Sequence, residues 1–395
     1  MAHVGDKVDA AGRSFQLAKK VGTGAAATVW TIESTWPAWR SRHTLPADIL
    51  VKIYDKPALQ PKFRPDASSI ESHATAIMLR LANANIAFPA MDIASPIHRV
   101  TGPNGDFVGL ALPAFREGWD PLESLWQGPE KLETLRDYAL ALARTTERIH
   151  EKDFVIGDFC PKNILCHRSK PRVAIVDVDS WGHIPGSDSI SASGFGFRDM
   201  GLTPFQPSRW EYSPGGNSLD NPTRQSDQYA LGLMLVEILT GMHPYGVDRV
   251  GYPTMDIRTN MQASRTWLVD SHLYLFDRTR FSQGRHPGVS ALAPCLQDLV
   301  EPLLDERVSN YAEAGKWVVA LETAIVDECI KCGNEKWRDA TCVGCANLSI
   351  LGASTATNQP ATGHPERSRS RVGIAVAAVV VAIMVVLLVL NIKYR

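Results

Sequence analysis

The sequence predicts an α+β fold of two lobes, followed by a small cysteine-rich segment and one C-terminal transmembrane helix. Residues 14–36 alternate apolar and polar side chains around a glycine pair, which predicts two strands joined by a turn. From about residue 129 onward the pattern is that of long helices. A strand-rich small lobe followed by a helix-rich large lobe implies a cleft between the two.

The elements between these landmarks follow from the same periodicities. A strand is expected over 47–55 (ADILVKIYD), a helix over 69–83 and a further strand over 105–115. Long helices are expected within 129–152, 226–245 and 291–326. The polar segment 182–224 is rich in Gly, Ser and Pro, so we expect an extended loop of the functional kind there.

The charge balance excludes one class of partner. The 41 Lys and Arg residues offset 42 Asp and Glu residues, so no basic field argues for nucleic acid. The N-terminus lacks the charged-then-apolar pattern of a signal peptide, and we expect the bulk of the chain in the cytoplasm.

Four of the seven cysteines form two C-x2-C pairs near the C-terminus: Cys329, Cys332, Cys342 and Cys345. Two such knuckles can close a tetrahedral thiolate site, so we expect a zinc ribbon over 327–347 with one structural Zn²⁺ and a partner that the sequence does not identify. The alternatives are four unrelated cysteines or a redox pair, and neither pair lies in a βαβ pattern. We expect the rest of the chain to fold without this metal.

The C-terminal segment is apolar on every face. From Val372 to Leu390 there is no charged residue, which predicts a single-pass transmembrane helix after a flexible linker over 348–371. The alternative, a buried core helix, has no domain left to be buried in. We therefore expect a C-terminal anchor in the plasma membrane, with the catalytic part on the cytoplasmic side.

Glycines and a buried lysine predict a phosphate site in the N-terminal part. Gly22 and Gly24 would let backbone amides approach a phosphate, and Val29 would cover a flat base; the alternative is an ordinary hairpin turn. Lys52, within an apolar strand, needs an anion and a carboxylate partner, unless it lies on an edge facing solvent. Glu71 on the next helix is the expected partner, the alternative being an exposed helix glutamate.

Three acidic residues and an asparagine follow in the middle of the chain. Asp158 and Asn163 have the D-x-x-x-x-N spacing in which a carboxylate takes a hydroxyl proton and an amide oxygen holds magnesium. Asp177 and Asp179 end an apolar strand, where carboxylates suit a hard cation or simply form a polar turn. The part played by Asp179 stays open.

Taken in order, these residues resemble those of the serine/threonine protein kinase family over 14–326. The resemblance implies ATP and Mg²⁺ as cofactors and a protein substrate. It makes Asp158 the catalytic base, with Lys52 orienting the phosphates and Asn163 and Asp177 holding magnesium. It also places Leu112 behind the adenine, and gives Asp227 and Arg307 bracing and anchoring roles.

Several positions depart from the family pattern. The third loop glycine is Ala27, and the small residue two before the lysine is Leu50. The His-Arg pair before Asp158 is absent, Cys160 stands where a lysine is usual, and the D-F-G triplet reads Asp-Val-Asp. We expect a membrane-tethered serine/threonine kinase; the alternative is a nucleotide-binding pseudokinase scaffold that recruits partners to the membrane.

Overall fold

The fold is described from a computed structural model of the chain. The described residues are 2–23, 27–33, 49–55, 70–88, 90–115, 117–126, 131–184, 223–240, 273–275, 284–286, 291–304 and 310–345.

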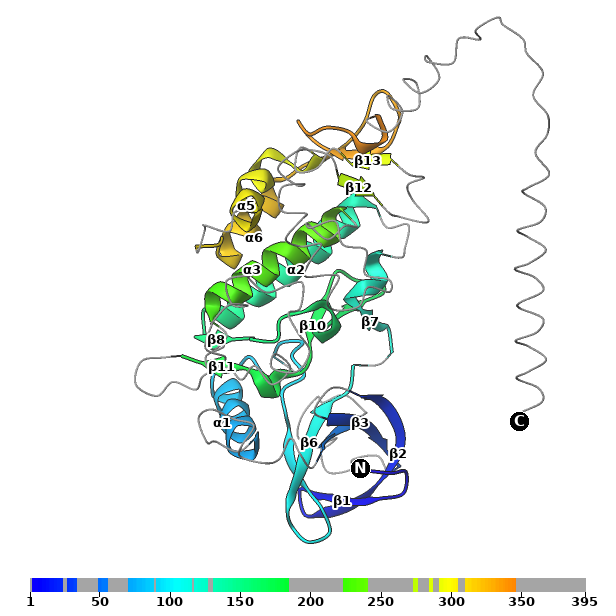
Figure 1. The fold of residues 1–395 in the computed structure, drawn as a ribbon, viewed down its shortest axis with the longest axis vertical. Helices are drawn as coiled ribbons and strands as arrows, with labels where there is room; N and C mark the ends of the chain where they lie inside the picture. Colours follow the sequence, from blue (N-terminus) through cyan, green and yellow to red (C-terminus); the bar gives the residue numbers. More distant parts are fainter. Residues whose placement is uncertain are drawn as a thin grey trace, which may run out of the picture. The chain divides into compact units, whose positions relative to one another are not determined.

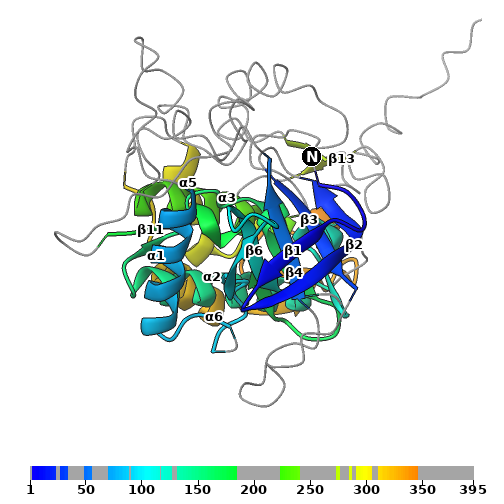
Figure 2. The same cartoon turned by 90° about the horizontal axis from the view of Figure 1, so that it is seen from below.

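The N-terminal strands close into an antiparallel β-barrel (Figures 1 and 2). Its strands follow the order β1-β2-β3-β4-β6-β5, and β5 pairs with β1 to close it. Their bounds are Lys7–Ala10 (β1), Arg13–Thr23 (β2), Ala27–Ile32 (β3), Ile49–Tyr54 (β4), His98–Thr101 (β5) and Phe107–Pro113 (β6).

The two faces of β4 have different surroundings. Val51 and Ile53 point into the barrel, where they pack with Trp30 and Leu17 in a closed apolar core. Because side chains alternate along a strand, Lys52 and Tyr54 lie on the outer face. Tyr54 packs there with residues of helix α1 (Ile70–Asn83).

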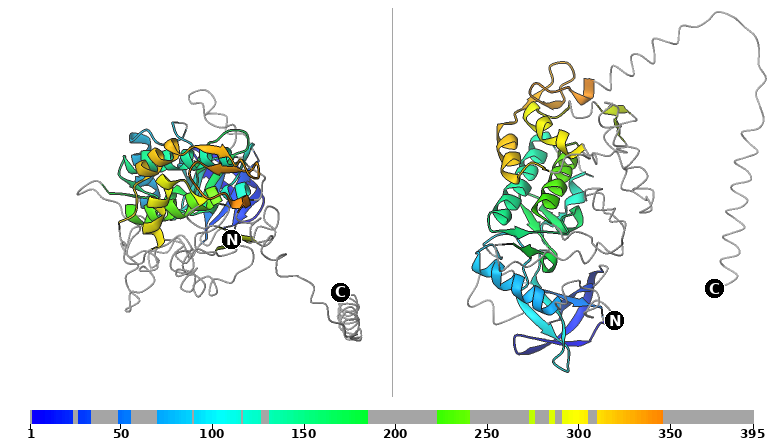
Figure 3. Two further views of the ribbon diagram at one scale, coloured as in Figure 1. Left: turned by 90° about the horizontal axis from the view of Figure 1, so that it is seen from above. Right: turned by 60° about the vertical axis from the view of Figure 1, so that its left-hand side comes forward.

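The remaining helices share one large apolar core. Helix α2 (Leu132–His150) packs against both α3 (Arg224–Thr240) and α6 (Ala314–Thr323), while α5 (Pro294–Leu304) lies against α3 and α6 (Figure 3). Helix α3 is buried on every side from Ser226 to Leu239, which fits the apolar run over 229–236 but also buries the polar side chains of Asp227 and Glu237. The helices expected within 69–83, 129–152, 226–245 and 291–326 are thereby confirmed.

Short strands and 3-10 turns connect these helices. Two of the 3-10 turns, Pro161–Asn163 and Val178–Ser180, carry polar residues of the candidate site. The bounds of these strands and turns are Trp119–Pro121 (β7), Leu122–Trp126 (η3), Phe154–Val155 (β8), Pro161–Asn163 (η4), Ile164–His167 (β9), Val173–Ile175 (β10), Val178–Ser180 (η5), Gly182–His183 (β11), Leu273–Leu275 (β12), Gly284–His286 (β13), Val326–Glu328 (β14) and Glu335–Trp337 (β15).

The β14–β15 hairpin belongs to the same core as the helices. Trp337 is 2% exposed and lies among the side chains of the large core. The Glu335 carboxylate accepts a hydrogen bond of 2.6 Å from the backbone N–H of Leu132 at the start of α2. The cysteine-bearing segment is therefore docked on the helices rather than separate from them.

The predicted two-lobed kinase-like α+β fold is wrong. The N-terminal strands close into a six-stranded antiparallel barrel, because β1 and β5 pair across a long sequence separation. Residues Met1–Ile350 form one compact unit, so the described residues are not divided into two separate lobes with a cleft.

The predicted membrane anchor is also corrected. Among the described helices, none is both long enough and apolar enough to span a bilayer. The predicted linker (348–371) and span (372–390) lie outside the described residues. The transmembrane helix and the plasma-membrane localisation are therefore not retained.

Candidate functional site

Lys52 is the cationic centre of the candidate site. It lies mid-strand on the outer face of β4, directly opposite Val29 on β3 in the strand register. A Cβ atom added to Gly109 on the neighbouring strand β6 would overlap the backbone oxygen of Lys52. The close approach of β6 to β4 at Lys52 thus requires glycine at position 109.

Lys52 binds two carboxylates that come from one turn. Its Nζ atom lies 2.8 Å and 3.0 Å from the two oxygens of Asp179 and donates a further hydrogen bond to Oδ1 of Asp177. The hydroxyl of Tyr54 also donates to Asp179. Asp177 has a left-handed backbone (φ 64°), a conformation that aspartate tolerates better than most residues. The alternative of a solvent-facing edge lysine is excluded.

The pKa values of the two carboxylates are shifted in opposite directions. Burial raises the pKa of Asp177 to about 6, opposed by the charge of Lys52. Burial acts on Asp179 as well, but the Lys52 charge and the hydrogen bonds from Lys52 and Tyr54 outweigh it and lower the pKa of Asp179 to about 2. Burial alone would lower the pKa of Lys52, yet the two neighbouring carboxylates raise it above its ordinary value. The cluster holds one lysine cation whose firm counter-ion is Asp179.

Asp158 and Asn163 face each other across a tight turn. The side-chain amide of Asn163 donates to the backbone oxygen of Asp158 at 2.9 Å and to its carboxylate at 3.1 Å. Burial raises the pKa of Asp158, while Asn163, Cys160 and the charge of Lys52 oppose that rise. Since the charge of Asp158 also raises the pKa of Asp177, the two carboxylates share one electrostatic environment.

Asp227 fixes the backbone that leads into Asp158. Its fully buried carboxylate accepts hydrogen bonds from the backbone N–H groups of Ile156 (2.7 Å) and Gly157 (3.0 Å), and lies 3.1 Å from Nε2 of His150. The bracing contact expected of this residue from α3 is present.

Glu71 is not the partner of Lys52. Its carboxylate lies 2.7 Å from Nε of Arg99 on the barrel, and both side chains are more than one-third exposed. The expected Lys52–Glu71 pair is therefore wrong among the described contacts, because the turn at 177–179 supplies the carboxylates instead.

The other predicted nucleotide-site residues lie on neighbouring strands. Gly22 is paired with Val29 across the β2–β3 hairpin, and Leu112 on β6 is buried with Tyr54 beside α1. Gly24, Arg307 and most of the expected loop over 182–224 lie outside the described residues.

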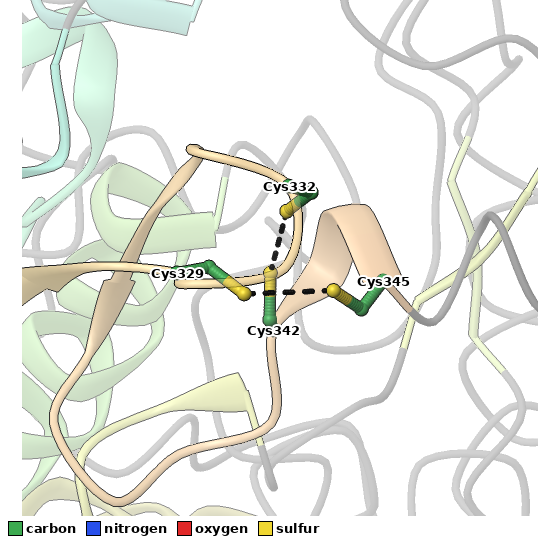
Figure 4. A group of neighbouring side chains, drawn as sticks. All are labelled: Cys329, Cys332, Cys342 and Cys345. Atoms are coloured by element: carbon green, nitrogen blue, oxygen red, sulfur yellow. Dashed lines mark hydrogen bonds between the residues drawn. The ribbon is translucent and has the colours of Figure 1, made fainter.

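The four clustered cysteines form a candidate metal centre (Figure 4). Their sulfur atoms all lie within 4.8 Å of one another, with Cys329–Cys345 and Cys332–Cys342 separated by 3.5 Å. This spacing excludes disulfides, and it is close to the ~3.8 Å between thiolates bound tetrahedrally at ~2.3 Å from zinc. Backbone N–H groups of Lys331 and Cys332 lower the pKa of Cys329 to about 6, whereas hydrogen bonds with Cys329 and Cys332 raise the pKa of Cys345 to about 12, so Cys329 is the thiol of this pair that loses its proton first. The four residues could bind a metal ion such as zinc.

Two contributors to the site were missed in the sequence. The sequence leaves the role of Asp179 open and predicts Tyr54 only as a strand residue. A usable signal existed for Tyr54: it lies two positions after Lys52 on a strand, so it shares the face of the lysine. The contact of Asp179 with Lys52 depends on the bend at Asp177, which the sequence does not specify.

The comparisons with known proteins add no assignment. The chain matches no model of a known protein family, and no curated protein matches its sequence. Its function is therefore argued from the chemistry of the site.

Proposed function

We propose that this chain is an ATP-dependent serine/threonine protein kinase. The observation that carries the proposal is the shared electrostatic environment of Lys52, Asp158 and Asp177, with Asn163 hydrogen-bonded to Asp158. Phosphoryl transfer needs a cation for the phosphates, oxygen ligands for a metal ion and a carboxylate near the hydroxyl, and this group supplies each of them. The order of the residues along the chain, which resembles that of protein kinases, points to a protein hydroxyl as acceptor.

Each residue has a distinct task in this proposal. Lys52 binds phosphate oxygens, and Asp158 accepts the proton of the attacking hydroxyl. Asn163 and Asp177 would hold Mg²⁺, which when bound would neutralise charge on the transferred phosphoryl group. The donor set fits a hard cation because its ligating atoms are oxygens: Asn163 uses its amide nitrogen on Asp158, so its carbonyl oxygen is the atom suited to the ion.

The cysteine centre has a structural task in the same proposal. Four thiolates leave no open position for a reacting ligand, which is typical of structural Zn²⁺. Zinc would hold the β14–β15 hairpin in the shape that places Trp337 in the core.

A second candidate is a scaffold that binds nucleotide without turnover. The observation in its favour is that Lys52 and Asp177 bind each other, which occupies both the phosphate-binding cation and a metal-binding carboxylate. Turnover requires Asp177 to leave Lys52 for the metal ion, whereas a scaffold can bind nucleotide while Asp177 stays on Lys52.

Turnover separates the two candidates. The purified full-length chain is incubated with radiolabelled ATP, Mg²⁺ and a basic acceptor protein, and ATP affinity is measured in parallel. We expect Mg²⁺-dependent incorporation of phosphate on serine or threonine. ATP binding without labelling of the chain or the acceptor, under Mg²⁺ and Mn²⁺ alike, would favour the scaffold.

A further inference from the structure

We infer that Asp179 is the residue that positions Lys52 for phosphate binding, and that Glu71 has no part in this task. The inference rests on the proposed phosphotransfer and deepens it by naming how the lysine is held. It assigns separate duties to two carboxylates that lie only two residues apart.

The first argument is the geometry at the lysine. Both oxygens of Asp179 lie within 3.0 Å of Nζ, whereas Asp177 contributes a single oxygen. A two-oxygen contact restricts the ammonium group in direction as well as in distance. Asp179 therefore determines where the charge of Lys52 is located.

The second argument is how firmly Asp179 is itself held. Its side chain is 10% exposed, and the Tyr54 hydroxyl on the same strand face as Lys52 donates to it. The turn that carries Asp179 is fastened to α1, where Nε2 of His73 lies 2.9 Å from the backbone oxygen of Trp181. A positioning residue needs supports of this kind.

The third argument is the contrast with Asp177. Its side chain is 35% exposed, so a solvent ion can reach it more readily than it can reach Asp179. When phosphate binds Lys52, the lysine can exchange Asp177 for phosphate oxygens and keep Asp179. Asp177 is then released to the metal ion while Lys52 stays in place.

Glu71 lacks each of these properties. Its side chain is 37% exposed, and its partner Arg99 is 48% exposed. An exposed ion pair of this kind orients neither group strongly.

The test combines a stability cycle with kinetics on the full-length chain. Thermal unfolding midpoints are measured for Lys52→Met, Asp179→Asn and the double variant, with Glu71→Gln replacing Asp179→Asn in the matched control cycle. We expect the Lys52–Asp179 double variant to lose clearly less than the sum of its single variants, because Lys52→Met leaves the buried charge of Asp179 unpaired and Asp179→Asn leaves Lys52 with Asp177 as its one remaining carboxylate in the cluster. The Lys52–Glu71 cycle should be additive.

The kinetic arm distinguishes positioning from packing. Asp179→Asn keeps the shape but loses the charge, and should lower kcat about 10²-fold with a smaller change in the KM for ATP. Asp179→Glu restores the carboxylate and should retain more activity than Asp179→Asn, whereas a mere packing role predicts the opposite order. The kcat of Glu71→Gln should stay within about twofold of the unmodified value, because substitutions of exposed residues usually have small effects.

The remaining outcomes are equally decisive. Coupling of Lys52 to Glu71 instead of Asp179, or full kcat in Asp179→Asn, overturns the inference. If Asp179→Asn does not fold, Tyr54→Phe takes its place, since it removes one support of Asp179 and should lower kcat with little change in KM; unchanged kcat then counts against the inference. If the unmodified chain transfers no phosphate, the stability cycle still decides how Lys52 is held, and only the proposed function fails.

Discussion

At the scale of single residues, the candidate site is a lysine shared by two unequal carboxylates. Asp177 and Asp179 differ in exposure and in the direction of their pKa shifts although one turn carries both. Such separation of two neighbouring acids is typical of sites where they perform different tasks.

Asp177 should control magnesium binding in a pH-dependent way. Its pKa in the folded chain is raised to about 6, so the ligating carboxylate is lost as the pH falls through about 6 rather than near its ordinary value of 3.8. We expect Mg²⁺-dependent affinity for ATP, measured by fluorescent nucleotide displacement, to weaken below that pH. At pH 7.5, Asp177→Asn should bind ATP with Mg²⁺ more weakly than the unmodified chain does.

Asp177→Asn is also the control for the titration of the nucleotide itself. Because ATP carries its own titrating phosphate, the pH dependence that remains in Asp177→Asn belongs to the nucleotide. An identical pH dependence in both proteins would contradict a metal-binding role for Asp177.

The residues of the candidate site were largely predictable from the sequence, whereas their pairing was not. A lysine inside an apolar strand and acids at a strand end are local signals that single out Lys52 and Asp177, but they do not predict that the two side chains bind each other. The choice of Asp179 over Glu71 depends on a left-handed backbone at Asp177 and on the docking of β4 against the 177–179 turn. Both features belong to the tertiary structure, which the spacing of residues along the chain does not predict.

At the scale of elements, the barrel and the buried helix α3 position the candidate site. Strand β4 carries Lys52, and Asp227 of α3 binds the backbone that leads into Asp158. Helices α1 and α2 were predictable because apolar side chains recur along one face of each, and α3 because it contains a long apolar run. Barrel closure was missed because β1 and β5 are four residues each and pair across most of the N-terminal region. Short strands of this kind leave little pattern to detect.

Alanine in place of either of two barrel glycines should affect stability very differently. Gly109→Ala forces β6 away from the backbone of Lys52, and should lower the free energy of unfolding by about 1–3 kcal/mol. Gly22→Ala meets no atom within 4 Å among the described residues, so stability should change by less than about 0.5 kcal/mol. If Gly22 lies under phosphates, its variant should raise the KM for ATP.

Chemical denaturation and ATP kinetics on the two variants check this pair. Equal stability of Gly109→Ala and the unmodified chain would contradict the close strand approach. An unchanged KM in Gly22→Ala would remove Gly22 from the nucleotide site.

Asp227 should couple helix α3 to the reactive loop. Asp227→Ala leaves two buried backbone N–H groups without their acceptor, which costs about 1–3 kcal/mol of stability and loosens the backbone that carries Asp158. We expect a lower unfolding midpoint together with a reduced kcat. The matched control is Asp137→Ala on α2, where the Asp137 side chain is 39% exposed and pairs with its neighbour Arg136; this variant should change stability by less than about 1 kcal/mol and leave kcat unchanged. A normal kcat in Asp227→Ala would contradict a link between α3 and the site.

At the scale of the whole molecule, the cysteine segment is part of the main core. The sequence predicted a separable ribbon, because its two knuckles look self-contained. The docking of Trp337 and the contact from Glu335 to Leu132 were not predictable, since a tryptophan between cysteines carries no sign of where it is buried.

Loss of the metal should therefore destabilise the entire described unit. Cys342→Ser, or removal of metal with a chelator, releases the hairpin that holds Trp337. We expect the free energy of unfolding to fall by about 3–5 kcal/mol, the scale of removing a buried aromatic side chain. Calorimetry and metal analysis measure both effects, with about one zinc per chain expected in the unmodified protein. This reverses the sequence-based expectation that the rest of the chain is indifferent to the metal.

The control for that experiment lies in the same segment. Ile330 is 99% exposed between the first two cysteines, so Ile330→Ser should keep both metal and stability. Metal loss in Cys342→Ser with an unchanged unfolding midpoint would show that the hairpin folds apart from the helices.

The central claim, phosphoryl transfer with Asp158 as the base, is tested most directly by Asp158→Asn. The purified variant and the unmodified chain are compared for phosphate incorporation and for Mg²⁺-dependent ATP affinity. We predict that the variant keeps ATP affinity within about threefold while incorporation falls by at least ~10²-fold, because an amide accepts no proton. Equal incorporation by both proteins, or none by the unmodified chain, would contradict the claim.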